Sequence, residues 1–286
     1  MTAFLEQYAA LRRGCAERSA GGIRWVVSEE LEGLGCLHGF TLRFGGVSAP
    51  PFDTLNLGYN RPEPAENVTE NYRRLAAAAG FDFSTMALCN FCHGDGVETA
   101  TAAQCGWGFP NHPAFPPCDA LASNDPAVTL VTLHADCMPV FLYDPAKRAG
   151  AMIHAGWKGN SLRIGEKAAR RLMANYGCHP KDLRAFFGPS IGPCCFEVDE
   201  PVKRVFDAAF PGLPAARWDE ARGKYLVDLV MTMAAQLFDC GLPVENMQDA
   251  GRCTCCGEGF FSYRRDKKRF GKTGAMAGFL RVPPRA

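Results

Sequence analysis

Histidine and cysteine side chains gather in three short segments where apolar runs meet turns. These segments are CNFCHGDG at residues 89–96, HADCMP at 134–139 and HAGWKG at 154–159. If the apolar runs form neighbouring strands, Cys137 and His154 project from adjacent strand ends. A thiolate beside a neutral imidazole is a donor pair that suits zinc, and His93 adds a third ligand that leaves one position open for water or substrate.

A structural interpretation competes with the metal-binding one for each of these residues. Separations of 44 residues between His93 and Cys137, and of 17 residues between Cys137 and His154, form no local metal-binding finger. Free cysteine is among the most frequently buried residue types, and a core histidine often only makes hydrogen bonds. The residues alone leave both interpretations open.

Four polar residues are candidates for contact with an anion or a sugar. Arg43 stands just before a Gly-Gly turn, where a guanidinium can hold an anion through two hydrogen bonds. Ser48 and Asn56 are candidates for hydrogen bonds to ribose or phosphate, or else they cap turns. Lys158 precedes a helix expected at 161–176, whose N-terminus favours phosphate. The simpler alternative for Arg43 and Lys158 is a solvated surface side chain.

Two aspartates are candidates for proton transfer. Asp119 is interpreted as a general acid or base and completes, with Arg43, the predicted catalytic pair. Asp136 is the second candidate, but on an extended segment its side chain points away from that of Cys137 and orients a ligand instead. The other histidines are interpreted as ordinary structural residues: His38, His112, His134 and His179.

The remaining cysteines suggest two further patterns. Cys89-x-x-Cys92-His93 fits the attachment motif of a c-type haem, but that attachment normally accompanies export, and no export signal is visible. Cys253-x-x-Cys256 is a second CxxC pair that could join the first in a four-cysteine structural zinc site. Fourteen cysteines in a long chain without a signal peptide otherwise indicate reduced thiols, Cys255 among them.

The composition indicates a globular protein with balanced charge. Hydrophobic residues make up 47% of the chain, and 31 basic against 30 acidic residues give a net charge of +1. This balance argues against nucleic acid as a partner, and no apolar run is long enough to span a bilayer. The expected location is the cytoplasm, and the oligomeric state is left open.

Hydrophobic patterning predicts one domain over residues 1–286. An N-terminal helical extension is expected at 1–23. Clustered strands with helices inserted at intervals indicate an α+β or mixed α/β fold. Strands are expected at 24–28, 39–44, 127–134, 140–143, 150–154, 183–187 and 279–282, and helices at 65–79, 161–176, 201–210 and 227–240.

Six ordered motifs resemble those of the laccase-domain family, also described as polyphenol oxidoreductases or peptidoglycan-editing factors. The motifs are LNLG at 55–58, CHG at 92–94, HADCMPV at 134–140, HAGWKG at 154–159, GPSIGPCCFEV at 188–198 and FFSYRRD at 260–266. The resemblance implies a single-domain α+β fold of four layers, α/β/β/α, with mixed sheets. It also implies that zinc is held by His93, Cys137 and His154.

The same resemblance implies a zinc-dependent purine nucleoside phosphorylase, which cleaves adenosine, inosine or guanosine with phosphate to free base and ribose 1-phosphate. Adenosine deamination at the same metal is a second implied activity. The family has no four-cysteine site, which favours free thiols at 253–256. The chain departs from the family pattern at Phe91-Cys92, His134, Lys158 and Lys272, which bears on substrate preference and leaves the metal ligands in place.

Three other functions stay open. A copper-dependent polyphenol oxidase would hold copper at the same ligands, although a multicopper oxidase needs many more histidines than six. A cysteine hydrolase would use Cys137 as its nucleophile and His154 as the base. A metal-stabilised interaction domain would close the site with a fourth protein ligand such as Cys92.

Overall fold

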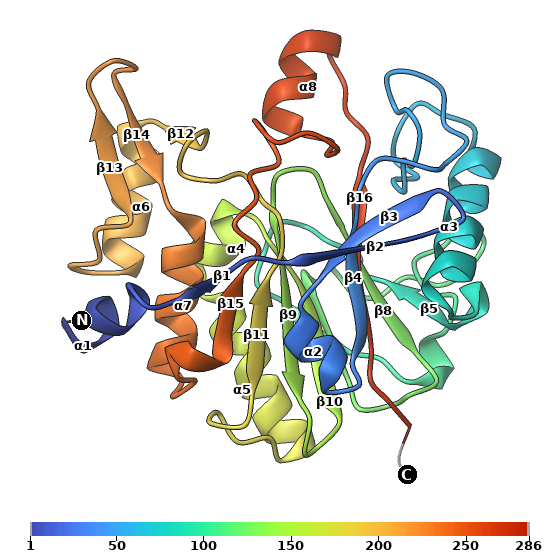
Figure 1. Ribbon diagram of the computed structural model, residues 1–286, viewed down its shortest axis with the longest axis horizontal. Coiled ribbons are helices and arrows are strands. Elements are labelled where there is room, and N and C mark those ends of the chain that lie inside the picture. Colours follow the sequence, from blue (N-terminus) through green and yellow to red (C-terminus); the bar gives the residue numbers. More distant parts are fainter. Residues whose placement is uncertain (1, 285–286) are drawn as a thin grey trace.

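The computed structural model describes residues 2–284, which form two large sheets, one small sheet and flanking helices (Figure 1). Sheet 1 has the order β1 (Arg12–Arg13), β15 (Met247–Asp249), β11 (Arg184–Phe187), β9 (Met138–Asp144), β10 (Ala149–Ala155), β7 (Ala120–Ser123) and β6 (Val97–Thr99). Sheet 2 has the order β2 (Ala16–Ala20), β3 (Ile23–Val27), β4 (Leu37–Thr41), β16 (Met276–Arg281), β8 (Thr129–His134) and β5 (Met86–Leu88). Both sheets mix parallel and antiparallel pairs.

The described residues form the helices α1 (Thr2–Tyr8), α2 (Glu29–Gly33), α3 (Ala65–Ala79), α4 (Trp157–Ser161), α5 (Ile164–Tyr176), α6 (Glu200–Ala209), α7 (Leu229–Asp239) and α8 (Tyr263–Phe270). Of these, α5 and α7 pack on the outer face of sheet 1, and α3 packs on the outer face of sheet 2. Single 3₁₀ turns lie at Phe83–Thr85, Ala102–Gln104 and Val244–Asn246. The small sheet 3, of β12 (Glu197–Val198), β14 (Lys224–Val227) and β13 (Ala216–Asp219), projects beside α6 (Figure 1). None of the helices described is long and apolar enough to cross a membrane.

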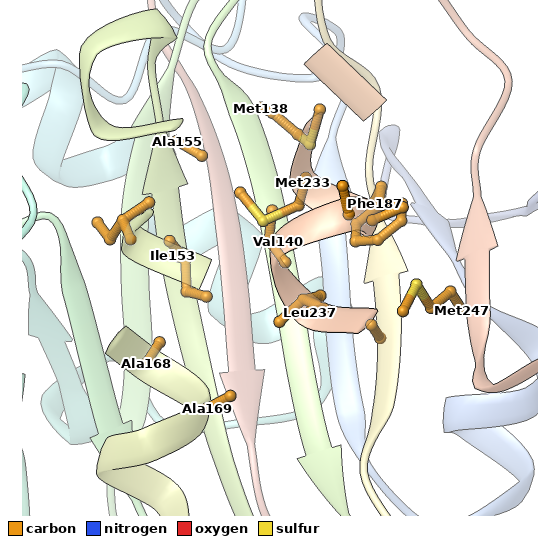
Figure 2. Packing of buried hydrophobic residues seen from close by; sticks show 14 of the residues in the cluster. Met138, Val140, Ile153, Ala155, Ala168, Ala169, Phe187, Met233, Leu237 and Met247 are labelled. Carbon is orange, nitrogen blue, oxygen red and sulfur yellow. The ribbon is translucent and has the colours of Figure 1, made fainter. Parts of the chain in front are cut away.

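The side chains of β9 show how the layers pack. Val140 and Leu142 point into a core that sheet 1 shares with α5 and α7, as Figure 2 shows for Val140 beside Met233 and Leu237. Phe141, the next residue along, points into a second core between sheets 1 and 2. This alternation buries both faces of the strand, as expected for a central sheet layer.

On the far side of sheet 2, α3 forms the outermost layer. Val68, Tyr72 and Leu75 recur at helical spacing and pack onto Val131 and Phe279 of the sheet. Gly80 ends the helix in the left-handed conformation, with φ of 81°. The order of layers is therefore helices, sheet 1, sheet 2 and helix, which confirms the expected α+β fold.

Two elements differ from the sequence-based expectation. The helix expected at 161–176 begins at Ile164 as α5, after a separate short helix α4, because Arg163 between them has φ of 63°, outside the right-handed helical region. Residues 1–23 do not form a helical extension: Met1 lies outside the described residues, and only Thr2–Tyr8 is helical. The segment after α1 pairs with β15 in sheet 1 and with β3 in sheet 2 instead.

Candidate active site

The three predicted metal ligands meet at one end of sheet 1. Cys137 lies in the turn between β8 and β9, His154 lies near the end of β10, and His93 lies in the loop before β6. Strands β9 and β10 are antiparallel with His154 opposite Pro139, which brings the thiol and the imidazole together. One donor atom from each of the three residues lies within 4.8 Å of the other two.

Asp119, which immediately precedes β7, supports this arrangement through hydrogen bonds. Its buried carboxylate accepts hydrogen bonds from His154 Nδ1 at 2.8 Å, from the His93 backbone N–H at 3.0 Å and from the Gly94 N–H at 2.7 Å. The backbone N–H of Cys92 also donates to it, at 3.2 Å. Because a carboxylate can only accept, the His154 proton lies on Nδ1 and Nε2 is free to bind a metal.

The ionisation of Asp119 is consistent with this supporting position. Burial raises the pKa of a carboxyl, but the hydrogen bonds from His154, Gly94 and Cys92 outweigh burial and lower the pKa of Asp119 below its ordinary range. The carboxylate therefore stays charged and faces the ligands. Asp119 does not line the adjoining cavity, so the structure gives the predicted acid–base residue a positioning contact instead.

The contact between Cys137 and His154 favours the ionised thiolate form of Cys137. Burial raises the pKa of Cys137, but the charge of His154 and its hydrogen bond lower it below the usual value for a thiol. Burial likewise lowers the pKa of His154, and the Cys137 charge with the Asp119 contact raises it overall. A metal ion would take the place of the proton that these two groups compete for.

Gly156 leaves the room that the three ligands need. A Cβ atom at this position would lie 3.1 Å from Cys137 Sγ and 3.4 Å from His93 Cδ2, tighter than ordinary van der Waals contact. The site therefore fits a metal on two grounds. Its donors are one thiolate and two imidazoles, the set that suits zinc or copper, and three protein ligands leave a further position open.

Two other histidines are excluded from metal binding by their own hydrogen bonds. His134 Nδ1 contacts the Cys137 carbonyl at 3.1 Å and its Nε2 contacts Thr132 Oγ1 at 2.7 Å. His38 uses Nδ1 on the Cys36 carbonyl and accepts the Ser28 N–H on Nε2. The remaining two, His112 and His179, are exposed and belong to neither group of metal-binding residues in the described chain.

Asp136 joins the turn of Cys137 to a distant segment. Its carboxylate accepts hydrogen bonds from Thr254 Oγ1 at 2.6 Å, from Ser262 Oγ at 2.9 Å and from the Arg264 N–H at 2.7 Å. Its φ of 87° is rare for a residue with a side chain, and such backbone conformations cluster at functional sites. These contacts anchor the residue next to Cys137, and they do not reach a ligand side chain, so the predicted role of Asp136 in orienting a ligand stays a prediction.

The metal site opens into a cavity of about 640 Å³, within the range of small-molecule sites. Phe91, Trp157 and Phe196 give it aromatic walls, and Arg61 and Arg264 supply positive charge. The buried Nε of Arg61 has no hydrogen-bond partner within residues 2–284. Burial lowers the pKa of this guanidinium, so an anion bound beside it would be strongly favoured.

Arg43 and Lys158 lie outside the wall of this cavity. Arg43 Nε donates to the Asp53 carbonyl at 2.6 Å, and its guanidinium stacks over the Phe261 ring at 4.3 Å. Lys158 lies inside α4, with its ammonium 5.7 Å from the Trp157 ring centre. The structure thus gives both side chains protein partners where the sequence suggested phosphate.

Ser48 and Asn56 are buried structural residues. Ser48 accepts a hydrogen bond from Asn71 Nδ2 at 2.8 Å, and Asn56 Oδ1 accepts the backbone N–H groups of Gly58 and Ala275 at 3.1 and 2.9 Å. Neither residue lines the cavity. The contacts of Asn56 with Gly58 and Glu63 instead fix the loop that carries Arg61, so its effect on a ligand is indirect.

Sequence reasoning missed Asn60, Arg61 and Tyr263 as cavity residues. One signal was available for the first two, since they follow the LNLG motif at 55–58 within three residues. Tyr263 and Arg264 belong to the FFSYRRD motif at 260–266. The next residue, Arg265, is held in an ion pair instead, with its Nε 2.8 Å from Asp266 Oδ1.

Comparisons with known proteins agree with this architecture. The model of the family described as multi-copper polyphenol oxidoreductase laccase matches residues 37–282. The protein named purine nucleoside phosphorylase from Deinococcus radiodurans is 38% identical over 87% of this chain and 90% of its own length. The protein named purine nucleoside phosphorylase YlmD from Geobacillus stearothermophilus is 33% identical over 86% of this chain and 90% of its own length. The crystal structure of YlmD from Geobacillus stearothermophilus superposes with a TM-score of 0.86 at 30% identity, covering 93% of this chain and 98% of that one. The chain therefore belongs to the multi-copper polyphenol oxidoreductase laccase family, as its motifs predicted.

Proposed function

We propose that this protein is a zinc-dependent purine nucleoside phosphorylase that converts adenosine, inosine or guanosine and phosphate to free base and ribose 1-phosphate. The observation that carries the proposal is the cavity itself. It joins a three-donor metal site to a half-buried arginine, Arg61, whose buried Nε lacks a partner in the described chain. The names of the relatives support the same activity.

The aromatic wall suits the purine. Phe91 lies directly against the metal ligands, with its ring centre 5.2 Å from that of His154. Trp157 and Phe196 line other parts of the same cavity. Flat apolar rings can stack on a base without selecting among purines, so this wall accounts for a nucleoside substrate and not for preference between nucleosides.

Arg61 is the proposed anchor for phosphate. The cost of burying an unpaired guanidinium is offset when an anion accepts its hydrogen bonds, and Arg presents donors that match phosphate oxygens in pairs. Arg264 lines the same cavity, while its own guanidinium donates to the carbonyls of Cys195 and Glu197. In this proposal Arg61 has the role that the sequence suggested for Arg43.

The residues around the metal then serve bond cleavage. Departure of the base leaves an oxocarbenium-like ribose, so the main requirement is an anionic nucleophile held beside C1′. Zinc held by His93, Cys137 and His154 would supply a Lewis acid in the wall of the cavity. Asp119 keeps His154 in the tautomer that binds metal, and Asp136 holds the Cys137 turn against the segment that carries Arg264.

The small number of histidines at possible metal sites argues against multicopper oxidation. Only two of the six histidines belong to a metal-binding group in residues 2–284, whereas several coppers would need many more. Deamination of adenosine by the same metal site remains a second proposed activity. It predicts inosine as a product whether or not phosphate is present.

One assay separates these reactions. Metal-analysed protein is incubated with adenosine or inosine, with and without inorganic phosphate, and the products are separated by chromatography. The phosphorylase is expected to release base only with phosphate, together with one equivalent of ribose 1-phosphate. Equal base release without phosphate would show a hydrolase and contradict the proposal.

Variants of Arg61 test the anchor. Arg61→Ala removes a charge-assisted contact in a desolvated site, which is worth about 2–4 kcal/mol, or roughly 30- to 1,000-fold in kcat/KM for phosphate. Arg61→Lys keeps the charge and should recover part of that loss. Arg43→Ala is the matched control, expected to leave phosphate saturation unchanged. A loss in Arg43→Ala with none in Arg61→Ala would reverse the assignment.

A further inference from the structure

A second group of possible ligands lies away from the histidine site. The sulfur atoms of Cys194, Cys195, Cys253 and Cys256 all lie within 4.8 Å of one another, and Cys194 Sγ is 3.6 Å from Cys256 Sγ. Tetrahedral zinc with Zn–S bonds of about 2.3 Å separates its sulfurs by about 3.8 Å. We propose that these four cysteines form a structural zinc site, distinct from the catalytic metal.

This site differs from the free thiols that the sequence favoured at 253–256, and also from the pairing of two CxxC motifs that was the alternative there. The CxxC at 253–256 does not meet the CxxC at 89–92, because Cys92 lies beside Asp119, with its Sγ 3.1 Å from the carboxylate. The partner is instead the adjacent pair Cys194-Cys195, about 60 residues earlier in the chain. Cys89 is buried elsewhere, next to Cys118 at 3.5 Å.

Backbone hydrogen bonds hold the two segments in place independently of a metal. Ser190 and Cys253 form a parallel bridge, and the Thr254 N–H donates to the Ser190 carbonyl at 2.9 Å. The Gly257 N–H donates to the Cys253 carbonyl at 2.9 Å and closes the turn between Cys253 and Cys256. The thiols therefore converge on a frame that is already built, which lowers the entropic cost of binding an ion.

Three arginines and one backbone N–H lie around the four cysteines. Arg222 donates to the Cys194 carbonyl at 2.8 Å, Arg264 to the Cys195 carbonyl at 3.3 Å and Arg265 to the Cys255 carbonyl at 3.1 Å. In addition, the Gly192 N–H donates to Cys253 Sγ at 3.2 Å. Four thiolates around a divalent ion carry a net charge of −2, which these donors would stabilise.

Zinc also accounts for the number of thiols better than a disulfide does. A disulfide would use two of the four sulfurs and draw them to about 2.05 Å, leaving the other two unexplained. A four-sulfur tetrahedral site uses all of them. Cys194 and Cys256 are exposed, so an ion can reach the site from solvent.

The proposed ion would brace one wall of the active-site cavity. Ile191 and Phe196 flank the Cys194-Cys195 pair and line the cavity, and Arg264 follows the 253–257 turn and lines it too. Asp136 accepts a hydrogen bond from Thr254, inside the turn between Cys253 and Cys256. The second site would therefore hold the substrate wall and the Cys137 turn together.

The test is metal stoichiometry, measured on full-length protein purified under reducing conditions without chelator. Wild type is expected to hold two zinc ions per chain. The Cys194→Ser/Cys256→Ser variant and the His93→Ala/His154→Ala variant should each hold one. Cys255→Ser, which removes a neighbouring thiol outside the group of four, is the matched control and should keep both ions.

X-ray absorption at the zinc edge of His93→Ala/His154→Ala avoids dependence on how well the cysteine variant folds. Its remaining zinc should show a shell of about four sulfur atoms at about 2.3 Å. The proposal would be overturned if wild type held one zinc and His93→Ala/His154→Ala lost it. It would also be overturned by an intact mass lower by two hydrogens, which would show a disulfide within the group of four. Because each variant affects one site, failure of the catalytic metal is distinguishable from failure of this one.

Discussion

Replacing Asp119 by asparagine tests how the catalytic metal site is supported. The change keeps the size of the side chain and removes its charge. At present one carboxylate oxygen accepts from His154 Nδ1 and the His93 N–H, and the other accepts from the N–H groups of Cys92 and Gly94. In either orientation, the asparagine amide therefore places its NH₂ group against two donors.

The expected magnitude follows from those contacts. A hydrogen bond to a charged group contributes about 1.5–3 kcal/mol, so losing two of them costs about 3–6 kcal/mol. Part of this loss destabilises the fold, and part weakens metal binding because His154 is no longer held with Nε2 free. Loss of such a supporting contact usually lowers metal affinity by about 10- to 100-fold, or about 1.4–2.7 kcal/mol.

Zinc affinity is measured by competition with a fluorescent chelator, and stability by thermal unfolding. Asp144→Asn is the matched control, since Asp144 is equally buried at the far end of β9. Its Oδ1 accepts the N–H groups of Ala146 and Lys147, and its Oδ2 has no partner in residues 2–284, so an amide costs no acceptor. If Asp119→Asn binds zinc as tightly as Asp144→Asn does, the supporting role of Asp119 is refuted.

Three further predictions follow from local geometry. His38 accepts the Ser28 N–H and is held neutral, so burial lowers its folded pKa to about 4 from 6.5. The unfolded chain thus binds the proton more tightly, so the free energy of unfolding should fall by about 3 kcal/mol as the pH falls from about 6.5 through 4. Urea unfolding measures this change, and an equal loss in His38→Gln would exclude His38 as the cause. Cys137 should resist iodoacetamide in the zinc-loaded protein and react after chelation, read by mass spectrometry at that residue; rapid alkylation of the loaded protein would favour the cysteine hydrolase. Gly156→Ala should weaken zinc binding, because its Cβ would crowd Cys137 Sγ. The control Gly33→Ala meets no atom within 4 Å and should bind zinc as the wild type does. Equal zinc affinity in both variants would contradict the crowding argument.

The candidate metal ligands could be brought together from local pattern. Cys137 and His154 lie where apolar runs meet turns, and the pairing of β9 with β10 meets the condition that these runs be neighbouring strands. The helix at Ala65–Ala79 was predicted to the residue, since its apolar spacing and its terminal glycine are both local signals. His93 was proposed from the same pattern, and the family motifs agree with all three residues.

The proposed anion contact could not be predicted, because it depends on long-range packing. Arg43 was expected to meet phosphate, yet Asp53 and Phe261 hold its guanidinium after folding. Arg61 gives no signal of its own, and the Asn56 hydrogen bonds that fix its loop reach as far as Ala275. The partner of the CxxC at 253–256 likewise depends on a bridge between Ser190 and Cys253 that no sequence spacing reveals.

The N-terminal segment has a practical consequence for anyone who shortens this protein. Since β1 lies at the edge of sheet 1 and β2 at the edge of sheet 2, residues 12–20 cover both sheets within nine residues. Trimming the chain to Ile23 would leave His93, Cys137 and His154 in place and uncover the edges of β15 and β3 together. Bare strand edges recruit strands from other molecules, so the shortened protein is expected to aggregate on storage.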